Sequence, residues 1–392
     1  MKARSLAVSD TCGRHNNLHL LRIIFALAVI YGHTGAIFAG PRIFAPISWL
    51  TQSNTYCGSV AVNGFFAISG FLVARSYYYN PNLLHWIYSR IFRIYPALWV
   101  CLIIIMSYIY ILYNSGTGFI DYISRDQVIS FITSNFSLTD IKFNLPNAFP
   151  GAKSNSVNGS FWTLPGEMRV YLLFLALALL GLAPSANKEK KIFGIKQDIL
   201  ASIAVCALLL ISLFASKYVP FIHHNKSYIP PTRCFLVGLF FFRFRNFIIF
   251  DYRIVIALVI ALALLVGHKD TFLFVLWPSV AYMTFYVAYG LPDARYYKLF
   301  GDYSYGVYIY GWFVQQIVAS WSFIPNGYVH AAVSMSLALA LAWISWNVIE
   351  KPALRAPNYL ADATPRLIAR ATPRLKTLFG ASGRIYAALF RR

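Results

Sequence analysis

Long apolar stretches alternate with short polar gaps along the chain. Most stretches run for about twenty residues, the length that an α-helix needs to cross the roughly 30 Å hydrocarbon core of a bilayer. They predict helices near residues 18–40, 58–79, 94–113, 160–183, 197–216, 230–250, 253–267, 271–291, 300–322 and 329–349. The pattern predicts an all-α integral membrane protein with about ten transmembrane helices, of which the seventh is the shortest.

The composition excludes a soluble enzyme. Of the 392 residues, 58% are hydrophobic and 12% are charged, against roughly 45–50% and about 25% in soluble domains. Lys and Arg number 34 against 13 Asp and Glu, a formal net charge of +21. These basic residues lie in the polar gaps, where cytoplasmic loops carry them, so we expect no nucleic-acid partner. The five cysteines form no Cys-x-x-Cys pair, so neither a metal site nor a disulfide framework is expected.

The distribution of Lys and Arg predicts the orientation in the membrane. With the N-terminus inside, 25 of the 34 fall in or beside cytoplasmic segments and 8 in outer segments. The positive-inside rule then places both termini in the cytoplasm, and an even number of spans agrees with this. The first stretch is too long for a signal-peptide core and ends without a clear cleavage site, so we expect it to be retained.

Three parts follow from this topology: a cytoplasmic N-terminal tail (1–17), a membrane domain (18–355) and a basic cytoplasmic C-terminal tail (356–392). The tail repeats Ala-Thr-Pro-Arg-Leu at 363–367 and 371–375, and it is typical either of a segment that lies on an anionic membrane surface or of a disordered basic tail. The longest loop, 114–159, is expected outside. It is either a plain linker or a lid or acceptor-binding surface.

Ionisable residues inside apolar stretches are functional candidates, because a charge at the centre of a membrane helix costs at least about 2.5–3.5 kcal/mol. Arg22 and His33 lie eleven positions apart in the first stretch. This spacing makes about three helical turns, so both side chains lie on nearly the same face, roughly 16 Å apart. Histidine suits proton removal and return near neutral pH. The alternatives are a structural hydrogen-bonding role for His33 and snorkelling of Arg22 to the headgroups.

Two further groups could carry chemistry. Arg90 and Arg93 lie at the expected cytoplasmic turn before the third span, at i and i+3 on one helix face. Together they form a two-pronged cationic site for phosphate, or they contact lipid headgroups. Glu167 is one of very few acids at membrane depth. It could orient a histidine, bind an acceptor hydroxyl, or pair with Arg169 or another arginine.

Aromatic and small polar residues complete the set of candidates. Tyr305, Tyr308 and Trp312 fall within two turns of the ninth stretch. A helix that lines a sugar-sized cavity would use such residues, although aromatic packing also explains them. Trp162 lies at the expected outer interface, where tryptophan is ordinary, and Ser69 lies among small residues that allow close helix packing. We count all five as candidate substrate contacts.

Six motifs occur in an order that resembles the acyltransferase-3 family of bacterial membrane O-acyltransferases. They are the Arg22-to-His33 spacing, Phe65-Phe-Ala-Ile-Ser-Gly-Phe-Leu72, Arg90-x-x-Arg93-Ile-x-Pro96, Phe161-Trp-Thr-Leu-x-x-Glu167-x-x-x-Tyr171, Asp302-Tyr-Ser-Tyr-x-x-Tyr308 and Ile349-Glu-Lys-Pro352. The resemblance covers residues 18 to about 355. It implies a multi-pass protein of the bacterial inner membrane.

The resemblance also implies an activity. The expected reaction transfers an acyl group, commonly acetyl from acetyl-CoA, to a hydroxyl of a lipopolysaccharide, exopolysaccharide or related glycolipid. The residue that matches His33 is the family's catalytic histidine, and those that match Arg22, Arg90 and Arg93 are linked with the donor. Glu167 is expected to act with His33. Acyl-CoA would be a co-substrate, with no tightly bound cofactor, and the expected partners are membrane lipids and a glycan acceptor.

The chain departs from the family pattern at two positions. Many members have two adjacent acids where Glu167 is followed by Met168, and many have a histidine where Gly311 stands. His33 is then the only well-placed base. The forty-residue tail is too short for the hydrolase-like domain of some members, so acceptor handling is expected in the bundle and its loops or in a separate protein.

Two other classes of function remain to be weighed. A transporter or flippase of a lipid-linked glycan would also place Arg, His and Glu inside a helical bundle. It predicts inverted repeats with interrupted helices, and the sequence has no such symmetry. A purely structural assembly subunit conflicts with the number of polar groups at membrane depth.

Overall fold

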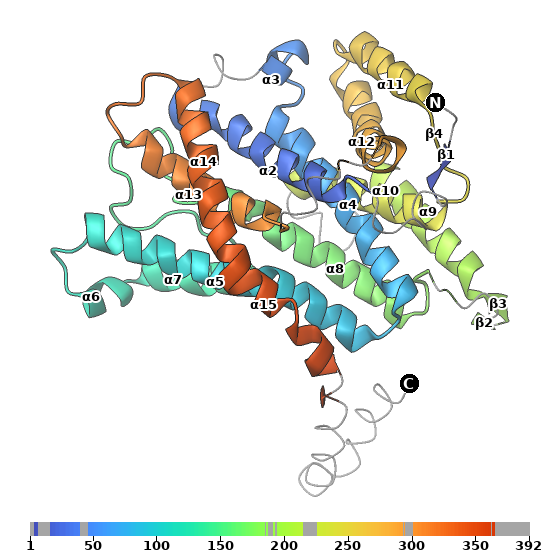
Figure 1. Cartoon of the computed structure of the whole chain (residues 1–392), viewed down its shortest axis with the longest axis horizontal. Helices are drawn as coiled ribbons and strands as arrows, with labels where there is room; N and C mark the ends of the chain where they lie inside the picture. The colour runs from blue at the N-terminus through green and yellow to red at the C-terminus, as the bar shows by residue number, and fades with distance from the viewer. Residues whose placement is uncertain are drawn as a thin grey trace, which may run out of the picture.

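A computed structural model describes residues 4–6, 16–39, 46–184, 186, 191–192, 194–214, 226–292, 294, 301–361 and 363–364. Most of the N-terminal tail and the C-terminal residues 365–392 lie outside this part of the chain. The protein is almost entirely helical (Figure 1). Two short antiparallel strand pairs join β1 (Arg4–Ser5) to β4 (Ile249–Phe250) and β2 (Lys191–Ile192) to β3 (Ile195–Lys196).

Each of the ten apolar stretches contains a helix. In chain order they are α2 (Leu18–Thr34), α4 (Cys57–Tyr79), α5 (Leu83–Tyr113), α8 (Leu164–Leu179), α9 (Gln197–Phe214), α10 (Ile229–Arg243), α11 (Tyr252–Leu265), α12 (Lys269–Phe285), α13 (Ser304–Ala319) and α14 (Gly327–Ser345). Short helices complete the set: α3 (Pro46–Leu50), α6 (Phe119–Ile123), α7 (Asp126–Ser137) and α15 (Lys351–Ala353). The expectation of an all-α membrane protein is therefore confirmed.

Seven helices in the described part of the chain are long and apolar enough to cross a membrane. They are Leu18–Phe38, Cys57–Tyr79, Leu83–Tyr113, Gly159–Leu179, Gln197–Phe214, Lys269–Gly290 and Gly327–Ala361. The remaining three, α10, α11 and α13, have 15, 14 and 16 residues. The count of ten spans and the cytoplasmic placement of both termini stay predictions.

The expected start of the third span is wrong by about eleven residues. Helix α5 begins at Leu83 instead of near residue 94, so Arg90 and Arg93 lie within a helix and not in a turn. The Asn82 side chain accepts a hydrogen bond from the His85 backbone amide at 3.0 Å and caps the helix N-terminus. The polar residues at the start of α5 lower the local hydropathy, so the hydropathy pattern did not predict this part of the helix.

The central helices pack in the order α10, α4, α2, α13, α14, and Figure 1 shows α4 and α2 in the middle of the bundle. The closest approach joins α4 to α10. A Cβ atom at Gly70 would lie 2.0 Å from the Phe235 carbonyl oxygen, and one at Gly238 would lie 2.1 Å from the Ala67 carbonyl oxygen. Glycine at both positions lets the two backbones touch, as small residues do in membrane helix pairs.

Replacing Gly238 with alanine should therefore destabilise the fold. The added methyl group would overlap a backbone atom that cannot rotate away, and such overpacking costs about 1–3 kcal/mol. We expect a lower melting temperature for Gly238→Ala in detergent, measured by fluorescence-detected size-exclusion chromatography. Gly267→Ala is the control, because a Cβ atom there would meet nothing within 4 Å. Equal melting temperatures for the two variants would contradict the close approach of α4 and α10.

Candidate functional site

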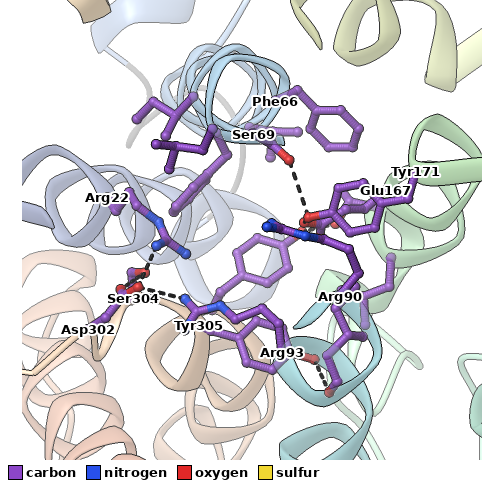
Figure 2. A pocket seen from close by; sticks show the side chains of 18 of the residues that line it. Arg22, Phe66, Ser69, Arg90, Arg93, Glu167, Tyr171, Asp302, Ser304 and Tyr305 are labelled. Carbon is purple, nitrogen blue, oxygen red and sulfur yellow. Dashed lines mark hydrogen bonds and ion pairs between the residues drawn. The ribbon is translucent and has the colours of Figure 1, made fainter. Parts of the chain in front are cut away.

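A cavity of about 300 Å³ lies where α2, α4, α5, α8 and α13 converge (Figure 2). Three arginines reach it, Arg22 from α2 and Arg90 and Arg93 from α5. The other polar side chains of its lining are Ser69, Ser89, Thr163, Glu167, Tyr171, Asp302, Ser304, Tyr305 and Tyr308. Apolar residues such as Val62, Phe65 and Phe66 form the rest. Seven of the ten candidate residues from the sequence thus share one cavity.

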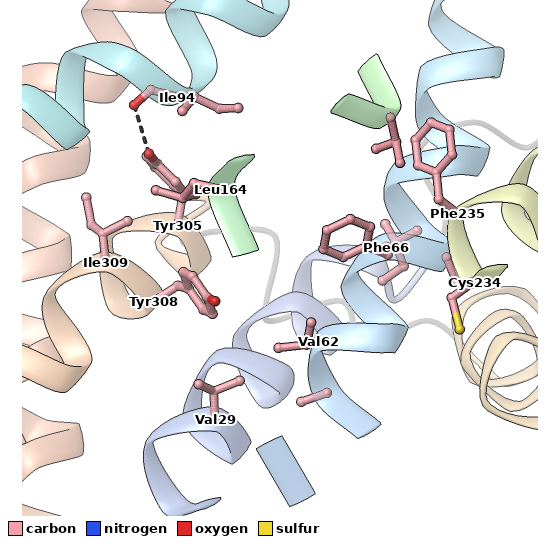
Figure 3. Packing of buried hydrophobic residues seen from close by; sticks show 14 of the residues in the cluster. Val29, Val62, Phe66, Ile94, Leu164, Cys234, Phe235, Tyr305, Tyr308 and Ile309 are labelled. Carbon is pink, nitrogen blue, oxygen red and sulfur yellow. Dashed lines mark hydrogen bonds between the residues drawn. The ribbon is translucent and has the colours of Figure 1, made fainter. Parts of the chain in front are cut away.

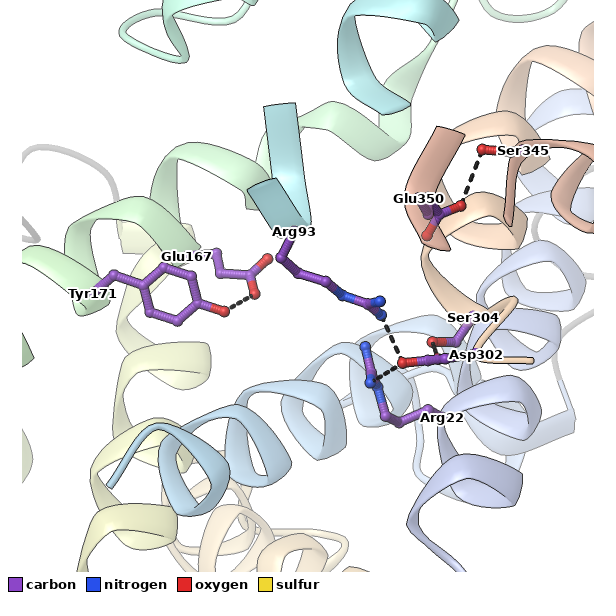
Figure 4. A network of polar contacts seen from close by, with 8 residues as sticks. All are labelled: Arg22, Arg93, Glu167, Tyr171, Asp302, Ser304, Ser345 and Glu350. Atoms are coloured by element: carbon purple, nitrogen blue, oxygen red, sulfur yellow. Dashed lines mark hydrogen bonds and ion pairs between the residues drawn. The ribbon is translucent and has the colours of Figure 1, made fainter. Parts of the chain in front are cut away.

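Asp302 joins two of the three arginines (Figure 4). Its Oδ2 atom accepts hydrogen bonds from Arg22 Nη1 and, at 2.8 Å, from Arg93 Nη2. Ser304 Oγ donates to the other carboxylate oxygen at 2.6 Å. The Asp302 side chain is only 8% exposed, so the contacts between these opposite charges are little screened by water. One carboxylate therefore fixes helices α2 and α5 to the start of α13.

Asp302 was not among the residues selected from the sequence, although it belongs to one of the six motifs. The available signal was an acid at the start of the ninth apolar stretch in a chain with 13 acids in all. That stretch begins on the same expected side of the membrane as Arg22, so pairing between the two was a reasonable inference.

Arg90 differs from its neighbours because no carboxylate lies within ion-pair distance of it among the described residues. Its Nη2 atom donates to Ser76 Oγ at 3.2 Å, and its guanidinium carbon lies 5.8 Å from the ring centres of Trp86 and Tyr171. Its Nε atom is buried without a partner in this part of the chain. Arg90 is the pocket arginine with most capacity left to bind an anion.

Glu167 accepts a hydrogen bond from the Tyr171 hydroxyl, which lies 3.2 Å from Ser69 Oγ. The alternative that Glu167 pairs with Arg169 is wrong in this structure, since the Arg169 guanidinium stacks over the Tyr228 ring at 4.7 Å. No contact between Glu167 and His33 occurs among the described residues. The carboxylate is therefore placed to act at the cavity and not directly on the histidine.

The aromatic candidates separate into two groups. Tyr305 and Tyr308 line the cavity, and their hydroxyls donate to the carbonyls of Ile94 and Ser160, both at 2.8 Å. Tyr308 also lies 2.6 Å from Thr163 Oγ1. The cavity ends at this pair, one helical turn before Trp312.

Trp162 and Trp312 do not line the cavity. The Trp162 ring stacks on Tyr228, with centroids 6.1 Å apart. The Trp312 ring packs against His33 instead. Tyr305 and Tyr308 therefore share the cavity, whereas Trp312 lies outside its lining, and the role of all three as substrate contacts stays a prediction.

His33 is not among the lining residues of the cavity and is 9% exposed. Its imidazole packs edge-on against the Trp312 indole, with centroids 4.7 Å apart. Its Nδ1 atom is buried and has no hydrogen-bond partner among the described residues. Val29, one turn before His33 on α2, belongs to the same apolar cluster as Val62 and Tyr308 (Figure 3). His33 is thus held in a packed, enclosed position with one nitrogen unassigned.

The ion pairs of Asp302 lead to a stability prediction. In Asp302→Asn two partly buried guanidinium groups, 20% and 14% exposed, lose their carboxylate, and removing one partner of a fully buried ion pair costs about 3–5 kcal/mol, which is the upper limit here. We expect a clearly lower melting temperature in detergent. Asp140→Asn is the matched control, because Asp140 pairs with Lys142 at 2.7 Å with both side chains largely in solvent, and such pairs contribute about 0–1 kcal/mol. An unchanged melting temperature for Asp302→Asn would show that the two arginines do not depend on this carboxylate.

Comparisons with known proteins agree with the sequence motifs. The chain is 27% identical over 367 residues to the O-acetyl transferase of Shigella phage Sf6, a match that covers 90% of this chain and 98% of the relative. It is 24% identical over 367 residues to nodulation protein 10 of Rhizobium leguminosarum bv. viciae, covering 88% and 94%. No solved structure matches. The sequence model of the acyltransferase domain matches residues 15–347, so the chain belongs to the acyltransferase-3 family and is a multi-pass membrane acyltransferase.

Proposed function

We propose that the protein is an O-acetyltransferase that transfers an acyl group from acyl-CoA, in the simplest case acetyl-CoA, to a hydroxyl of a surface or exported glycan. The proposal rests on the cavity lined by three arginines and on the position of His33, which lies on the same helix as Arg22, about three turns away. The O-acetyl transferase named among the relatives supports acetyl as the group transferred. The positive-inside rule supports a cytoplasmic position for the arginines of the cavity, in the bacterial inner membrane.

The arginines would bind the phosphates of the donor. Among the described residues Arg90 has no carboxylate partner, while Arg22 and Arg93 share the single carboxylate of Asp302 and keep further N–H donors. The volume of about 300 Å³ lies at the lower limit for small-molecule pockets. It suits the slender pantetheine arm, with the nucleotide at the mouth and the thioester pointing toward Tyr308.

His33 would act as a general base at the other end of the path. Eleven residues of α-helix separate it from Arg22, about 16 Å along the axis. The extended arm of the donor would span this distance after the side chains between Tyr308 and His33 move aside, because His33 is not in the lining of the cavity. The neutral imidazole removes the proton of the acceptor hydroxyl while the hydroxyl oxygen bonds to the thioester carbonyl carbon. The C–S bond then breaks, and the CoA sulfur receives the proton that the imidazole took up. A transient acyl group on His33 would be an alternative course of the same transfer. General-base assistance contributes about 10² to 10⁴ in rate.

The role of His33 is tested by His33→Ala. We expect O-acylation of the host's surface glycan to fall by at least 10²-fold, because the hydroxyl loses its base. Mass spectrometry of the polysaccharide before and after mild base treatment measures the ester groups. His268→Ala, which changes an exposed histidine before α12, should leave them unchanged. Undiminished acylation in His33→Ala cells with normal protein levels would refute the assignment.

The donor site is tested separately by Arg90→Ala. Losing one hydrogen bond between charged groups costs about 1.5–3 kcal/mol, so the KM for acetyl-CoA should rise at least tenfold in membrane preparations. Adding Arg93→Ala should raise it further, although this change also releases Asp302. Arg253→Ala, an exposed arginine on α11, is the control. A double variant with the acetyl-CoA dependence of the unmodified protein would exclude a phosphate-binding role.

A further inference from the structure

Several buried polar side chains are linked by contacts to His33, at the end of α2 opposite Arg22. The described part of the chain has sixteen buried side-chain atoms without a hydrogen-bond partner, and six of them belong to this group: His33 Nδ1, Ser156 Oγ, Ser160 Oγ, Gln315 Oε1, Gln316 Oε1 and His330 Nδ1. We call these six residues the His33 cluster. An unpartnered buried polar atom costs about 1–3 kcal/mol, and native proteins contain few of them. Six such atoms on residues joined by direct contacts point to a ligand that completes them.

Direct contacts join the cluster around Trp312. The indole that packs on His33 donates from its Nε1 atom to the Ser156 carbonyl at 2.9 Å. Gln316 Nε2 donates to the same carbonyl at 2.7 Å. A Cβ atom at Gly159 would lie 2.7 Å from the Trp312 ring, so the segment that carries Ser156 and Ser160 runs directly against the indole.

The other side of the cluster is formed by α13 and α14. Gln315 Nε2 donates to the Ile30 carbonyl at 2.8 Å and to Thr34 Oγ1 at 3.1 Å. His330 Nε2 lies 3.0 Å from the Gln315 carbonyl oxygen, and its ring stacks on Phe38 with centroids 4.8 Å apart. These contacts use the amide nitrogen of Gln315 and one nitrogen of His330. They leave Gln315 Oε1 and His330 Nδ1 available.

The segment 153–160 covers the His33 cluster. Val157 and Asn158 within it have no exposed surface. Two contacts fasten it to the bundle: Gln316 Nε2 of α13 also donates to the Ser154 carbonyl at 2.8 Å, and Lys153 of the segment donates from Nζ to the Phe38 carbonyl. The segment therefore holds Ser156 and Ser160 in place beside Trp312.

The chemistry of the cluster selects a neutral, hydroxyl-rich ligand. It offers two carboxamide oxygens, which accept hydrogen bonds, two hydroxyls, which both accept and donate, and two imidazole nitrogens. It contains no arginine and no carboxylate, in contrast to the cavity near Arg90. Lys153, on the segment that covers the cluster, is exposed and already donates to the Phe38 carbonyl, so an anionic group inside the cluster would lack a buried counter-charge, which is costly. A sugar ring without charged substituents matches these atoms, and the Trp312 indole adds an aromatic face.

We infer that the His33 cluster is the acceptor site and binds a neutral sugar ring of the glycan next to the catalytic histidine. This inference rests on the proposed acyltransferase function. It assigns Ser156, Ser160, Gln315 and Gln316 to acceptor binding, and it makes the end of the 114–159 loop part of that site. His330 contributes from α14 through its contact with Gln315.

Two single substitutions test the inference, Ser156→Ala and Ser160→Ala. Each removes an unpartnered hydroxyl and keeps the backbone contacts of the residue, so the melting temperature should stay the same or rise. Binding of the acceptor should weaken, because one hydrogen bond to the ligand is lost. We expect the KM for the acceptor to rise about three- to tenfold, while the KM for acetyl-CoA stays unchanged.

The assay uses membranes that contain the full chain, labelled acetyl-CoA, and the host's surface polysaccharide freed of its esters by mild base. Ser336→Ala is the matched control on α14, since its exposed hydroxyl bonds only to the Ala332 carbonyl at 3.0 Å. If both serine variants show the acceptor KM of the unmodified protein, while His33→Ala is inactive, the acceptor site is wrong and the proposed function stands. If the unmodified protein consumes no acetyl-CoA, the proposed function itself fails. Transfer only to sugar rings that carry a carboxylate or phosphate would overturn the neutral character of the site.

Discussion

The arrangement of the functional region depends on the carboxylate of Asp302. It receives hydrogen bonds from Arg22 and Arg93, whose cationic groups would otherwise repel each other in a place where water screens them poorly. By joining α2, α5 and the start of α13 it keeps a cavity open between helices that the hydrophobic effect does not hold together inside a bilayer. Arg90, which the carboxylate does not reach, stays available beside them. Arg22 and Arg93 thus have a structural contact in addition to the donor role proposed for them, whereas Arg90 forms no ion pair among the described residues.

Much of the fold was predictable because the length and hydropathy of each apolar stretch are enough to predict a helix there. The ten helices fall where the apolar stretches predicted them, and the error at α5 arose where polar residues precede the apolar part of a helix that Asn82 caps. The site was predictable only in part. Arg22 could be selected because basic residues are rare in apolar stretches, and Arg90 and Arg93 because they lie at i and i+3 on one helix face. An acid at the start of an apolar stretch indicates a polar contact there, but the partners of Asp302, Arg22 and Arg93, lie more than two hundred positions away and are identified only by the fold. Trp312 was grouped with Tyr308 by sequence proximity, but it packs on His33 and is not part of the lining of the cavity.

Helix α2 carries two polar environments of opposite character. Around Arg22 the groups are charged and paired through Asp302, whereas around His33 they are neutral amides, hydroxyls and imidazoles. The apolar residues between them, among which are Val29 and Val62, belong to the main core. This division corresponds to the chemistry of the proposed reaction, whose donor is anionic and whose inferred acceptor is not. The two environments are held on closely packed helices: a Cβ atom at Gly311 would lie 2.8 Å from Ile30, so α13 and α2 meet too closely there for a larger side chain.

The packing between the cavity and His33 has an electrical consequence for the cell. An enzyme whose cavity reached from one face of the membrane to a histidine near the other would offer ions a path down a potential worth about 2.3 kcal/mol per elementary charge for each 100 mV. The lining of the cavity does not include His33, and Val29, one turn before His33 on the same helix, is buried in the main core. Packed apolar side chains exclude the water that a crossing ion needs, so a cell could carry many copies of the protein without dissipating its membrane potential.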